Sequence, residues 1–327
     1  MSQADTPRVS FVIVAFNQSA YIDEAVASAL AQDYPNLQIV LSDDNSSDDT
    51  FARMQAIAAA YDGPHTIVLN RTGGGQGVLK HFYDALAHAD GEFMVGAAGD
   101  DMSAPYRVSR LVEAWRGTGA AGIYSGWNRV DVTGKFLAYE GIAQQHDRDM
   151  AAYFPDRDVR IAFGCTAAYD IAFLRSIPIP AQTIWSEDYF WSAVAMLAGR
   201  DILYLEDALV DYRQNPTALR NFSTGKVDHR AYELGENRFF TGLGDLLDAL
   251  VEILDAGMPP AGTRVDRAAI LHDIAWYRYR AEWPGRSLAA RIGYTAGLRA
   301  RDRLRWALPR VIGLEAFLVA KRLGRPG

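Results

Sequence analysis

Residues 10–17 have the sequence SFVIVAFN, and residues 42–50, one βα unit later, have the sequence SDDNSSDDT. The first stretch is an apolar run typical of a buried strand, and the second places acidic side chains directly after another predicted strand. A third acidic group, Gly99-Asp100-Asp101, also follows an apolar run. Because ligands of open α/β sheets bind beyond the carboxyl ends of the strands, these acids predict a ligand site at that edge.

Predicted strands and helices alternate through the first hundred residues. From Ser19, apolar residues recur at the spacing of a half-buried helix, and apolar runs at residues 37–41, 66–69 and 93–97 predict buried parallel strands. The order βαβαβαβ predicts an α/β fold with a Rossmann-like, mostly parallel sheet flanked by helices.

The chain beyond Asp101 follows a different pattern. The predicted elements are a helix near Pro105, a hairpin of residues 123–132 and 135–139, a helix from about Ile171, and short strands at 202–204 and 208–212. After Asn221 the pattern is predominantly helical.

The composition is that of a globular protein, with 49% hydrophobic and 22% charged residues in a chain of 327. The single cysteine, Cys165, excludes an intramolecular disulfide and a CxxC motif, which favours a reducing cytosol; we interpret it as a small buried residue. No run approaches the roughly 18 apolar residues of a membrane span, and the N-terminus lacks the pattern of a signal peptide. We therefore expect a soluble cytoplasmic protein.

The net charge of −7 is unevenly distributed along the chain. Residues 278–327 hold 12 Lys or Arg and three acids, so this tail carries +9 and the rest −16. The acidic body argues against specific nucleic-acid binding. Around Leu304, apolar residues at helical spacing lie beside arginines, which is typical either of a peripheral segment on an anionic membrane or of a packed helical subdomain. Both interpretations stay open.

Each acidic group has a structural and a functional interpretation. Asp48-Asp49 fits a helix start as well as a ligand site, whereas Asp44 has no predicted capping role. Asp100-Asp101 is either an exposed acidic turn or a repelling pair that a divalent cation compensates. Glu187-Asp188, directly ahead of a helix, either includes a general base or is favoured there by the helix dipole.

Together, these motifs resemble those of the family 2 glycosyltransferases with the GT-A fold. The resemblance extends from about Val9 to Pro216. The stretches that carry it are VIVAFNQSAYIDEAVASALAQ (12–32), SDDNSSDDT (42–50), GEFMVGAAGDD (91–101), FGCTAAY (163–169), SEDYFW (186–191) and LEDALVDYRQNP (205–216). It implies an inverting transfer of sugar from a nucleoside diphosphate sugar, UDP- or dTDP-sugar favoured, to a hydroxyl of a saccharide or lipid-linked saccharide, in cell-surface polysaccharide assembly.

The resemblance also implies roles for individual residues. The nucleotide would be bound by Ala15, Phe16, Asn17, Asp44 and Asp100. A divalent cation, Mg²⁺ or Mn²⁺, would be bound by Asp101 and Asp100, and Asp188 would be the general base.

Further contacts to the donor or the acceptor are expected from Glu187, Arg213, Gly77 and Trp127. For Arg213, an ion pair with Asp207 or Asp211 is an alternative that the sequence leaves open.

The resemblance implies a catalytic domain at residues 1–222, with a nucleotide-sugar half at about 1–101 and an acceptor half at about 102–222. A helical region, basic and amphipathic at its end, would follow at 223–327. Two other classes share part of the pattern. A non-catalytic nucleotide-sugar-binding or scaffold protein would not need Asp188, and a sugar-1-phosphate nucleotidylyltransferase would have a Gly-rich signature where this chain has Ala15-Phe16-Asn17-Gln18.

Overall fold

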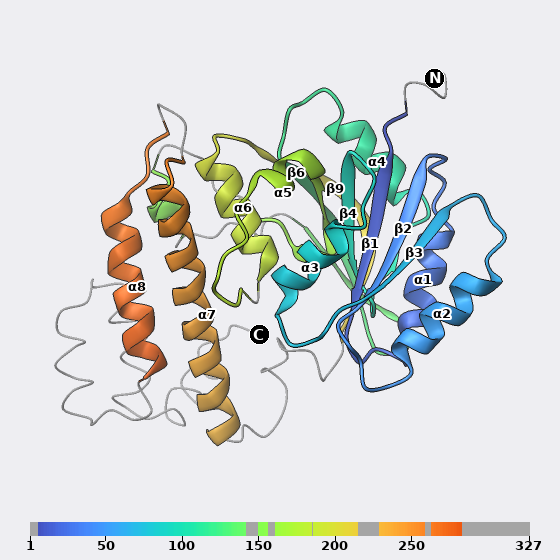
Figure 1. Ribbon diagram of the computed structural model, residues 1–327, viewed down its shortest axis with the longest axis horizontal. Helices are drawn as coiled ribbons and strands as arrows, with labels where there is room; N and C mark the ends of the chain where they lie inside the picture. The colour runs from blue at the N-terminus through green and yellow to red at the C-terminus, as the bar shows by residue number, and fades with distance from the viewer. Residues whose placement is uncertain are drawn as a thin grey trace. The chain divides into compact units, whose positions relative to one another are not determined.

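The computed structural model describes residues 6–141, 150–155, 161–184, 186–214, 229–258 and 263–282. These residues form one mixed sheet with the strand order β3-β2-β1-β4-β8-β6-β9-β5, and β7 pairs with β6 (Figure 1). The first four strands, which pair in parallel, are β1 (Val9–Ala15), β2 (Leu37–Asp43), β3 (Thr66–Arg71) and β4 (Phe93–Ala98). The predicted α/β class and its parallel half are confirmed.

Helices cover both faces of the parallel strands (Figure 1). These helices are α1 (Ile22–Leu30), α2 (Thr50–Ala60) and α4 (Arg107–Trp115) on one face and α3 (Val78–Leu86) and α6 (Glu187–Leu197) on the other. Alternate residues of β1, such as Phe11 and Ile13, pack into one buried apolar cluster with α1, α2 and α4. On the opposite face, Trp191 of α6 makes edge contacts with Phe82 and Tyr83 of α3.

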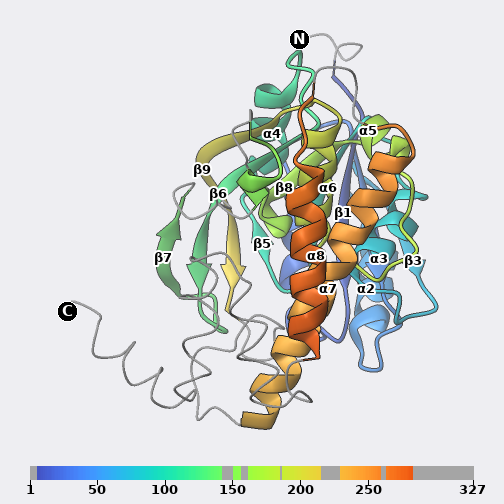
Figure 2. The ribbon, with the colours of Figure 1, turned by 90° about the vertical axis from the view of Figure 1, so that its left-hand side faces the viewer.

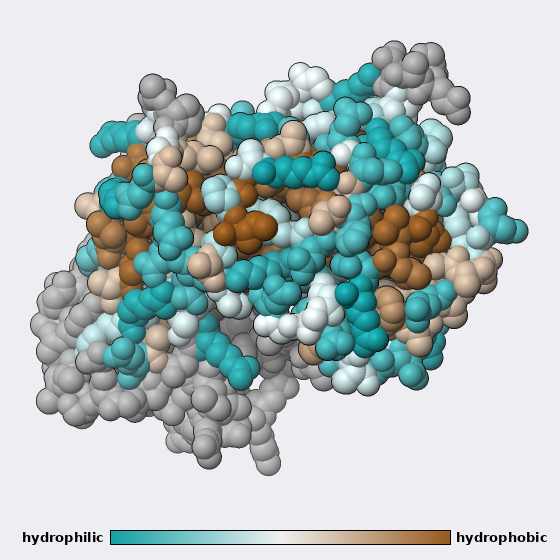
Figure 3. Space-filling view, viewed as in Figure 1, coloured by the Kyte–Doolittle hydropathy of each residue, from teal (hydrophilic) through white to brown (hydrophobic). Residues whose placement is uncertain are grey.

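Strand β3 differs from the fully buried strand that its apolar run predicts. It lies at one end of the sheet order, Leu69 is 37% exposed, and Ile67 and Val68 are half-buried. Figure 3 shows a hydrophobic patch over this strand. An apolar run indicates a strand, but the order of strands in the sheet decides how much of it is covered.

The second half of the sheet contains the predicted hairpin and two strands that the sequence did not indicate. The strands are β5 (Met102–Ser103), β6 (Gly122–Val130), β7 (Phe136–Glu140), β8 (Ala167–Asp170) and β9 (Ile202–Arg213). The β6–β7 hairpin is confirmed, and Figure 2 shows β7 along the outer side of β6. The two short strands predicted after residue 201 are one strand, β9, whose pairing with β6 skips Glu206-Asp207 at an irregularity beside Gly126.

The remaining elements are η3 (Met150–Ala152), η4 (Gly164–Thr166), α5 (Ile171–Ser176), α7 (His229–Asp255) and α8 (Arg267–Ala281). The chain divides into two compact units, residues 1–227 with 242–274 and residues 228–241 with 275–327. The first contains the sheet. In the second, Phe240 stacks on Tyr277 and lies beneath the guanidinium of Arg280.

The basic segment around Leu304, with its two open interpretations, lies outside the described residues. Among the helices that the structure describes, none is both long and apolar enough to cross a membrane.

Candidate functional site

Of the residues predicted to bind a nucleotide, all except Asp100 lie at the end of β1 or in the loops that follow β1 and β2, and hydrogen bonds join the two loops. The N–H of Asp44 donates to the carbonyl oxygen of Ala15 (2.9 Å), and the N–H of Asn17 donates to Oγ of Ser46 (2.8 Å). In return, Oδ1 of Asn17 accepts from the N–H of Ser47 (2.9 Å). Asn17 has φ of 52°, a left-handed conformation that asparagine adopts more readily than most residues. The structure therefore brings Ala15, Asn17 and Asp44 together.

Two side chains at this edge are suited to hold a flat polar ring. Phe16 is 57% exposed, although most of the phenylalanines that the structure describes are buried. Asp44 is half-buried, and its Oδ1 accepts from the hydroxyl of Thr72 (2.6 Å). An aromatic face and a carboxylate acceptor can bind a nucleobase by stacking and by accepting its N–H groups.

The adjacent Asp43 has a structural role. It is fully buried, accepts from the N–H and the hydroxyl of Ser46, and pairs with Nε of Arg71 (3.2 Å). These contacts shape the loop that presents Asp44.

Asp48 is accounted for by the helix-start interpretation. Its carboxylate accepts from the N–H of Thr50 and from the N–H of Ser19, both at 3.0 Å. Burial raises the pKa of Asp48, but hydrogen bonds from the hydroxyl of Thr50 and from these two N–H groups outweigh burial and lower that pKa to about 2.

Asp100 and Asp101 follow β4 on the other side of β1 from Asp44. Adjacent strands lie about 4.8 Å apart, so the two acidic groups are separated by roughly two strand spacings, or about 10 Å. Asp100 is half-buried, whereas Asp101 is only 4% exposed. Burial and the charge of Asp100 raise the pKa of Asp101 well above the usual range of a carboxyl, against the opposing effect of the Arg213 N–H.

The buried carboxylate of Asp101 fits a cation ligand. Its Oδ1 accepts from the N–H of Arg213 (2.9 Å), and the thiol of Cys165 also interacts with the carboxyl, while Oδ2 has no partner in hydrogen-bond geometry among the residues that the structure describes. A buried carboxylate oxygen without a donor is costly unless a cation compensates. Within the described ranges, no cluster of three or more His, Cys, Asp or Glu side chains forms a complete metal site. A cation here would share the pair with ligand oxygens, as Mg²⁺ commonly does with phosphates.

Arg213, at the end of β9, lies behind the acidic pair. Its Nε donates to the carbonyl oxygen of Asp100 (3.0 Å), and its side chain is 1% exposed. A direct contact of this guanidinium with the donor or acceptor does not fit that burial. The alternative, an ion pair with Asp207 or Asp211, is wrong, because Arg213 pairs with Glu24 on α1.

Asp188 lies in the first turn of α6 and is held by three donors. Its Oδ2 accepts from the N–H of Gly164 (3.0 Å), and its Oδ1 accepts from the hydroxyl of Ser186 (2.5 Å) and from the N–H of Tyr189 (2.8 Å). A carboxylate has about four lone-pair positions, so roughly one remains, on Oδ2. The side chain is 7% exposed. This geometry orients Asp188 and leaves it able to take one proton.

The three-residue turn η4 joins the surroundings of Asp101 to those of Asp188. Gly164 contributes the N–H that binds Asp188, and the carbonyl oxygen of Cys165 accepts from Nη2 of Arg107 (2.9 Å). Arg107 is fully buried, interacts with Asp101, and also donates to the carbonyl oxygen of Gly96 on β4 (2.8 Å). Burial lowers the pKa of Arg107 to about 10.

Sequence reasoning did not identify Arg107 or Gly164. A signal for Arg107 was present, because it lies four residues before Leu111 on the apolar face of α4. A charged residue on a buried face indicates a specific partner. Gly164 lies within the stretch FGCTAAY that carries the family resemblance, but the sequence did not indicate its role, because that role comes from Glu187 and Asp188, more than twenty residues away.

The other three predicted contacts differ in their surroundings. Trp127 is 6% exposed and stacks on Phe163 (4.4 Å between ring centroids), so it supports the site rather than facing a ligand. Gly77 has φ of +84° at the start of α3, and a Cβ there would lie 2.9 Å from Thr183. Glu187 is half-buried, with Oε1 packed against Gly164.

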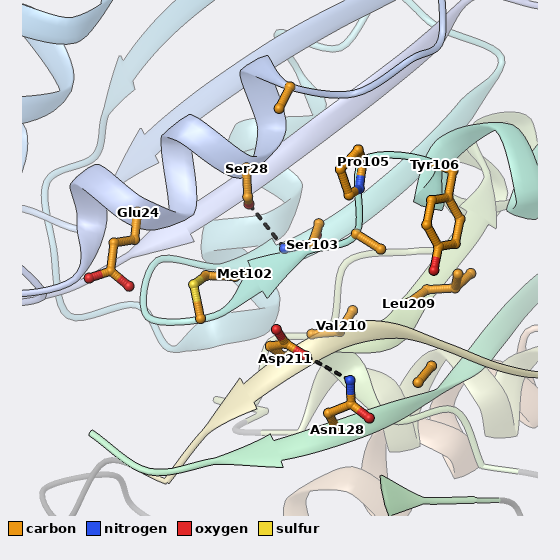
Figure 4. A pocket seen from close by; sticks show the side chains of 13 residues that line it. Glu24, Ser28, Met102, Ser103, Pro105, Tyr106, Asn128, Leu209, Val210 and Asp211 are labelled. Carbon is orange, nitrogen blue, oxygen red and sulfur yellow. Dashed lines mark hydrogen bonds between the residues drawn. The ribbon is translucent and has the colours of Figure 1, made fainter. Parts of the chain in front are cut away.

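A pocket of about 490 Å³ lies between α1, β5, β6 and β9 (Figure 4). Glu24 and Asp211 contribute carboxylates, and Asp211 accepts from Asn128 (2.8 Å). Asn128 and Asp211 alternate along their strands with Trp127 and Tyr212, both of which contact the ring of Phe163. The pocket therefore lies on the opposite face of these strands from Phe163, away from the turn that binds Asp188.

The chain is similar to known proteins over part of its length. The family model described as Glycosyl transferase family 2 matches residues 10–177, just over half of the chain. A Bacillus subtilis protein that carries the name glycosyltransferase EpsE is 30% identical over 106 residues, covering 32% of this chain and 37% of the relative. The GalNAc(5)-diNAcBac-PP-undecaprenol beta-1,3-glucosyltransferase of Campylobacter jejuni is 30% identical over 107 residues, covering 33% and 34%. The match thus spans about a third of each relative's length.

Solved structures share the fold at low sequence identity. Residues 1–349 of Staphylococcus aureus TarS in complex with UDP-GlcNAc superpose with a TM-score of 0.54 at 16% identity, covering 91% of this chain and 78% of that one. The mannosyltransferase PcManGT of Pyrobaculum calidifontis, in complex with GDP-Man and Mn²⁺, gives 0.54 at 18% identity, covering 94% and 81%. Together, the family match and the shared fold show that the chain belongs to glycosyl transferase family 2 and has the GT-A fold.

Proposed function

We propose that the protein transfers a sugar, with inversion, from a nucleoside diphosphate sugar to a hydroxyl of a saccharide or lipid-linked saccharide. The observation that carries the proposal is the link through η4. One turn binds both Asp188 and the arginine beneath Asp101, so a proton acceptor and an acidic pair suited to a diphosphate belong to one rigid arrangement.

The donor nucleotide would bind where β1 and β2 end. Phe16 offers an exposed ring to the base, and Asp44 accepts an N–H from it, with Asn17 fixing the loop between them. A carboxylate acceptor matches the ring N–H of uracil or thymine. Guanine also offers N–H groups to a carboxylate, so our proposal of a UDP- or dTDP-sugar as donor rests on the family resemblance, and the comparison of nucleotides below tests it.

Asp100 and Asp101 would hold Mg²⁺ or Mn²⁺. Such a cation supplies positive charge to the oxygens of the departing diphosphate. Asp101 would provide its unpartnered buried oxygen, and Asp100 the half-buried carboxylate beside it.

Asp188 would act as the general base. The acceptor oxygen attacks the anomeric carbon on the face opposite the diphosphate, and the bond from that carbon to the diphosphate oxygen breaks with its electrons on the oxygen. The hydroxyl proton passes to Oδ2 of Asp188, where one lone pair is available. A single displacement of this kind inverts the anomeric configuration.

The acceptor is proposed from a relative. The Campylobacter jejuni protein has an undecaprenol-linked saccharide in its name. We extend that acceptor class to this chain and propose a place in cell-surface polysaccharide assembly, at the cytoplasmic face of the membrane.

Thermal unfolding with nucleotides tests the donor site. The protein is heated with UDP, dTDP, GDP or ADP, each with and without Mn²⁺. A ligand at about 100 times its Kd stabilises by about 2.7 kcal/mol, which moves Tm by several degrees. The expected result is a shift with a pyrimidine diphosphate that requires Mn²⁺ and is lost in Asp101→Ala. A chain that responds to none of the four nucleotides would instead be a scaffold or a degenerate member of the family.

Membrane contact through the basic tail is tested separately. We expect the full-length protein to co-sediment with vesicles containing anionic lipid, and the triple variant Arg301→Glu, Arg303→Glu, Arg305→Glu to bind them less. Equal binding by the two proteins would remove this part of the proposal.

A further inference from the structure

Arg213 contacts both members of the acidic pair, although it is more than 110 residues away in the sequence. Its main-chain N–H donates to Oδ1 of Asp101 (2.9 Å), and its Nε donates to the carbonyl oxygen of Asp100 (3.0 Å). The end of β9 is thereby fixed to the peptide that presents the two carboxylates.

Both terminal nitrogens of the guanidinium also have partners. Nη1 donates to the carbonyl oxygen of Val132 after β6 (2.7 Å), and Nη2 donates to Glu24 on α1 (2.5 Å). The ring of Tyr21 lies 4.8 Å from the guanidinium carbon. The guanidinium is planar and rigid, so these partners fix its orientation. The fixed guanidinium in turn holds the Asp100 carbonyl oxygen through Nε.

The ion pair with Glu24 does not by itself explain why an arginine is buried here. Glu24 is 55% exposed, and pairs with an exposed partner contribute little to stability. The buried contacts of Arg213 go to main-chain oxygens, one of which belongs to Asp100. The main effect of the buried guanidinium is therefore to hold the acidic pair in place, and its ion pair with Glu24 is secondary.

We propose that Arg213 is a positioning residue for the Asp100-Asp101 pair. Its side chain fixes the peptide of Asp100, and its N–H occupies Oδ1 of Asp101, which leaves Oδ2 as the oxygen for a divalent cation. This inference rests on the proposed function, in which the pair holds that cation at the diphosphate.

The test is Mn²⁺ binding in the presence of saturating UDP, measured by calorimetry on the full-length protein. In Arg213→Met we expect Mn²⁺ affinity to fall about 10- to 100-fold, as it does when residues that orient metal ligands are removed. Arg213→Lys keeps the charge but loses the forked guanidinium, so we expect the Mn²⁺ affinity of this variant to fall as well. Glu24→Gln removes only the exposed ion pair and is expected to stay within about twofold of the unchanged protein.

Kinetics supply a second readout. Activity of Arg213→Met should be restored by raised Mn²⁺, so the half-saturating Mn²⁺ concentration changes more than kcat does. Unchanged Mn²⁺ affinity in both arginine variants overturns the inference, and so does failure of both to fold, because Arg213 would then hold the fold rather than the pair. If Asp101→Asn leaves Mn²⁺ binding of the otherwise unchanged protein intact, the proposed metal site fails instead.

Discussion

Asp188 is oriented by three donors, and its remaining lone pair is what the proposed chemistry needs. We predict that Asp188→Asn lowers kcat by about 10²- to 10⁴-fold, the usual contribution of a general base. Steady-state kinetics with the donor identified by thermal unfolding measures this, and unchanged UDP affinity with Mn²⁺ serves as the control for folding. A larger loss in Glu187→Gln than in Asp188→Asn would move the base to the neighbouring acid.

The burial of His81 leads to a prediction of how the free energy of unfolding depends on pH. It is buried on α3, where its Nε2 lies 2.9 Å from the hydroxyl of Ser42, which also accepts from the amide of Asn70 (2.9 Å). Burial lowers the pKa of His81 below its ordinary value near 6.5, so the unfolded chain takes up a proton at a higher pH than the folded one. The free energy of unfolding should therefore fall as pH drops below about 6.5.

Denaturant unfolding between pH 5 and 7.5 tests this expectation. His81→Gln should lose less stability on acidification than the unchanged protein. His88→Gln, at an exposed position two residues after the same helix, is the matched control. An identical pH dependence in the His81 variant would show that His81 does not carry the effect.

For single residues, the sequence predicts where Asp44 and Asp100 lie, because both follow strands of a parallel sheet, whose carboxyl ends share one edge. It could not predict what Arg213 contacts. Its partners follow from the pairing of β9 with β5, which comes directly after Asp100 and Asp101. These paired strands are more than 100 residues apart in the chain. Similarly, Asp43 and Asp44 are adjacent and chemically identical, and only the fold shows which one is buried against Ser46 and Arg71.

The turn η4 is the element whose geometry matters most to the proposed site. A Cβ at Gly164 would lie 2.4 Å from Oε1 of Glu187 and 3.5 Å from Oδ2 of Asp188. We predict that Gly164→Ala forces the Glu187 carboxylate, the flexible end of its side chain, to move while Asp188 stays at an ordinary contact distance, so that kcat falls by no more than about 10-fold. UDP affinity should be unchanged, because the nucleotide loops follow β1 and β2. Weaker UDP binding, or a much larger loss of kcat, would contradict this prediction.

Short elements are where sequence patterns failed. β5 has two residues and β8 has four, too few for alternation or an apolar run to stand out. β9 was predicted as two strands because Glu206 and Asp207 interrupt its apolar pattern, and the structure accommodates them at an irregularity opposite Gly126. By contrast, the apolar runs of the longer strands in the parallel half were sufficient to predict those strands.

For the molecule as a whole, one apolar cluster beneath the sheet is expected to dominate stability. Ile39 is fully buried in this cluster, whereas Leu137 on β7 is 45% exposed. We predict that Ile39→Ala costs about 2–5 kcal/mol of unfolding free energy and Leu137→Ala within about 0.5 kcal/mol. Urea unfolding followed by fluorescence measures both. Similar losses for the two would mean that β7 packs more tightly than its exposure indicates.

The link through η4 also bears on how enzymes of this family can acquire new acceptors. Since a three-residue turn connects the acidic pair to the proposed base, we expect that substitutions elsewhere on the proposed acceptor side can change the acceptor without disturbing the distance between the pair and Asp188. Exchanging acceptor-side segments with those of a relative, while keeping residues 163–166 of this chain, should change the acceptor and preserve the donor. The turn is thus a natural boundary for engineering new linkages.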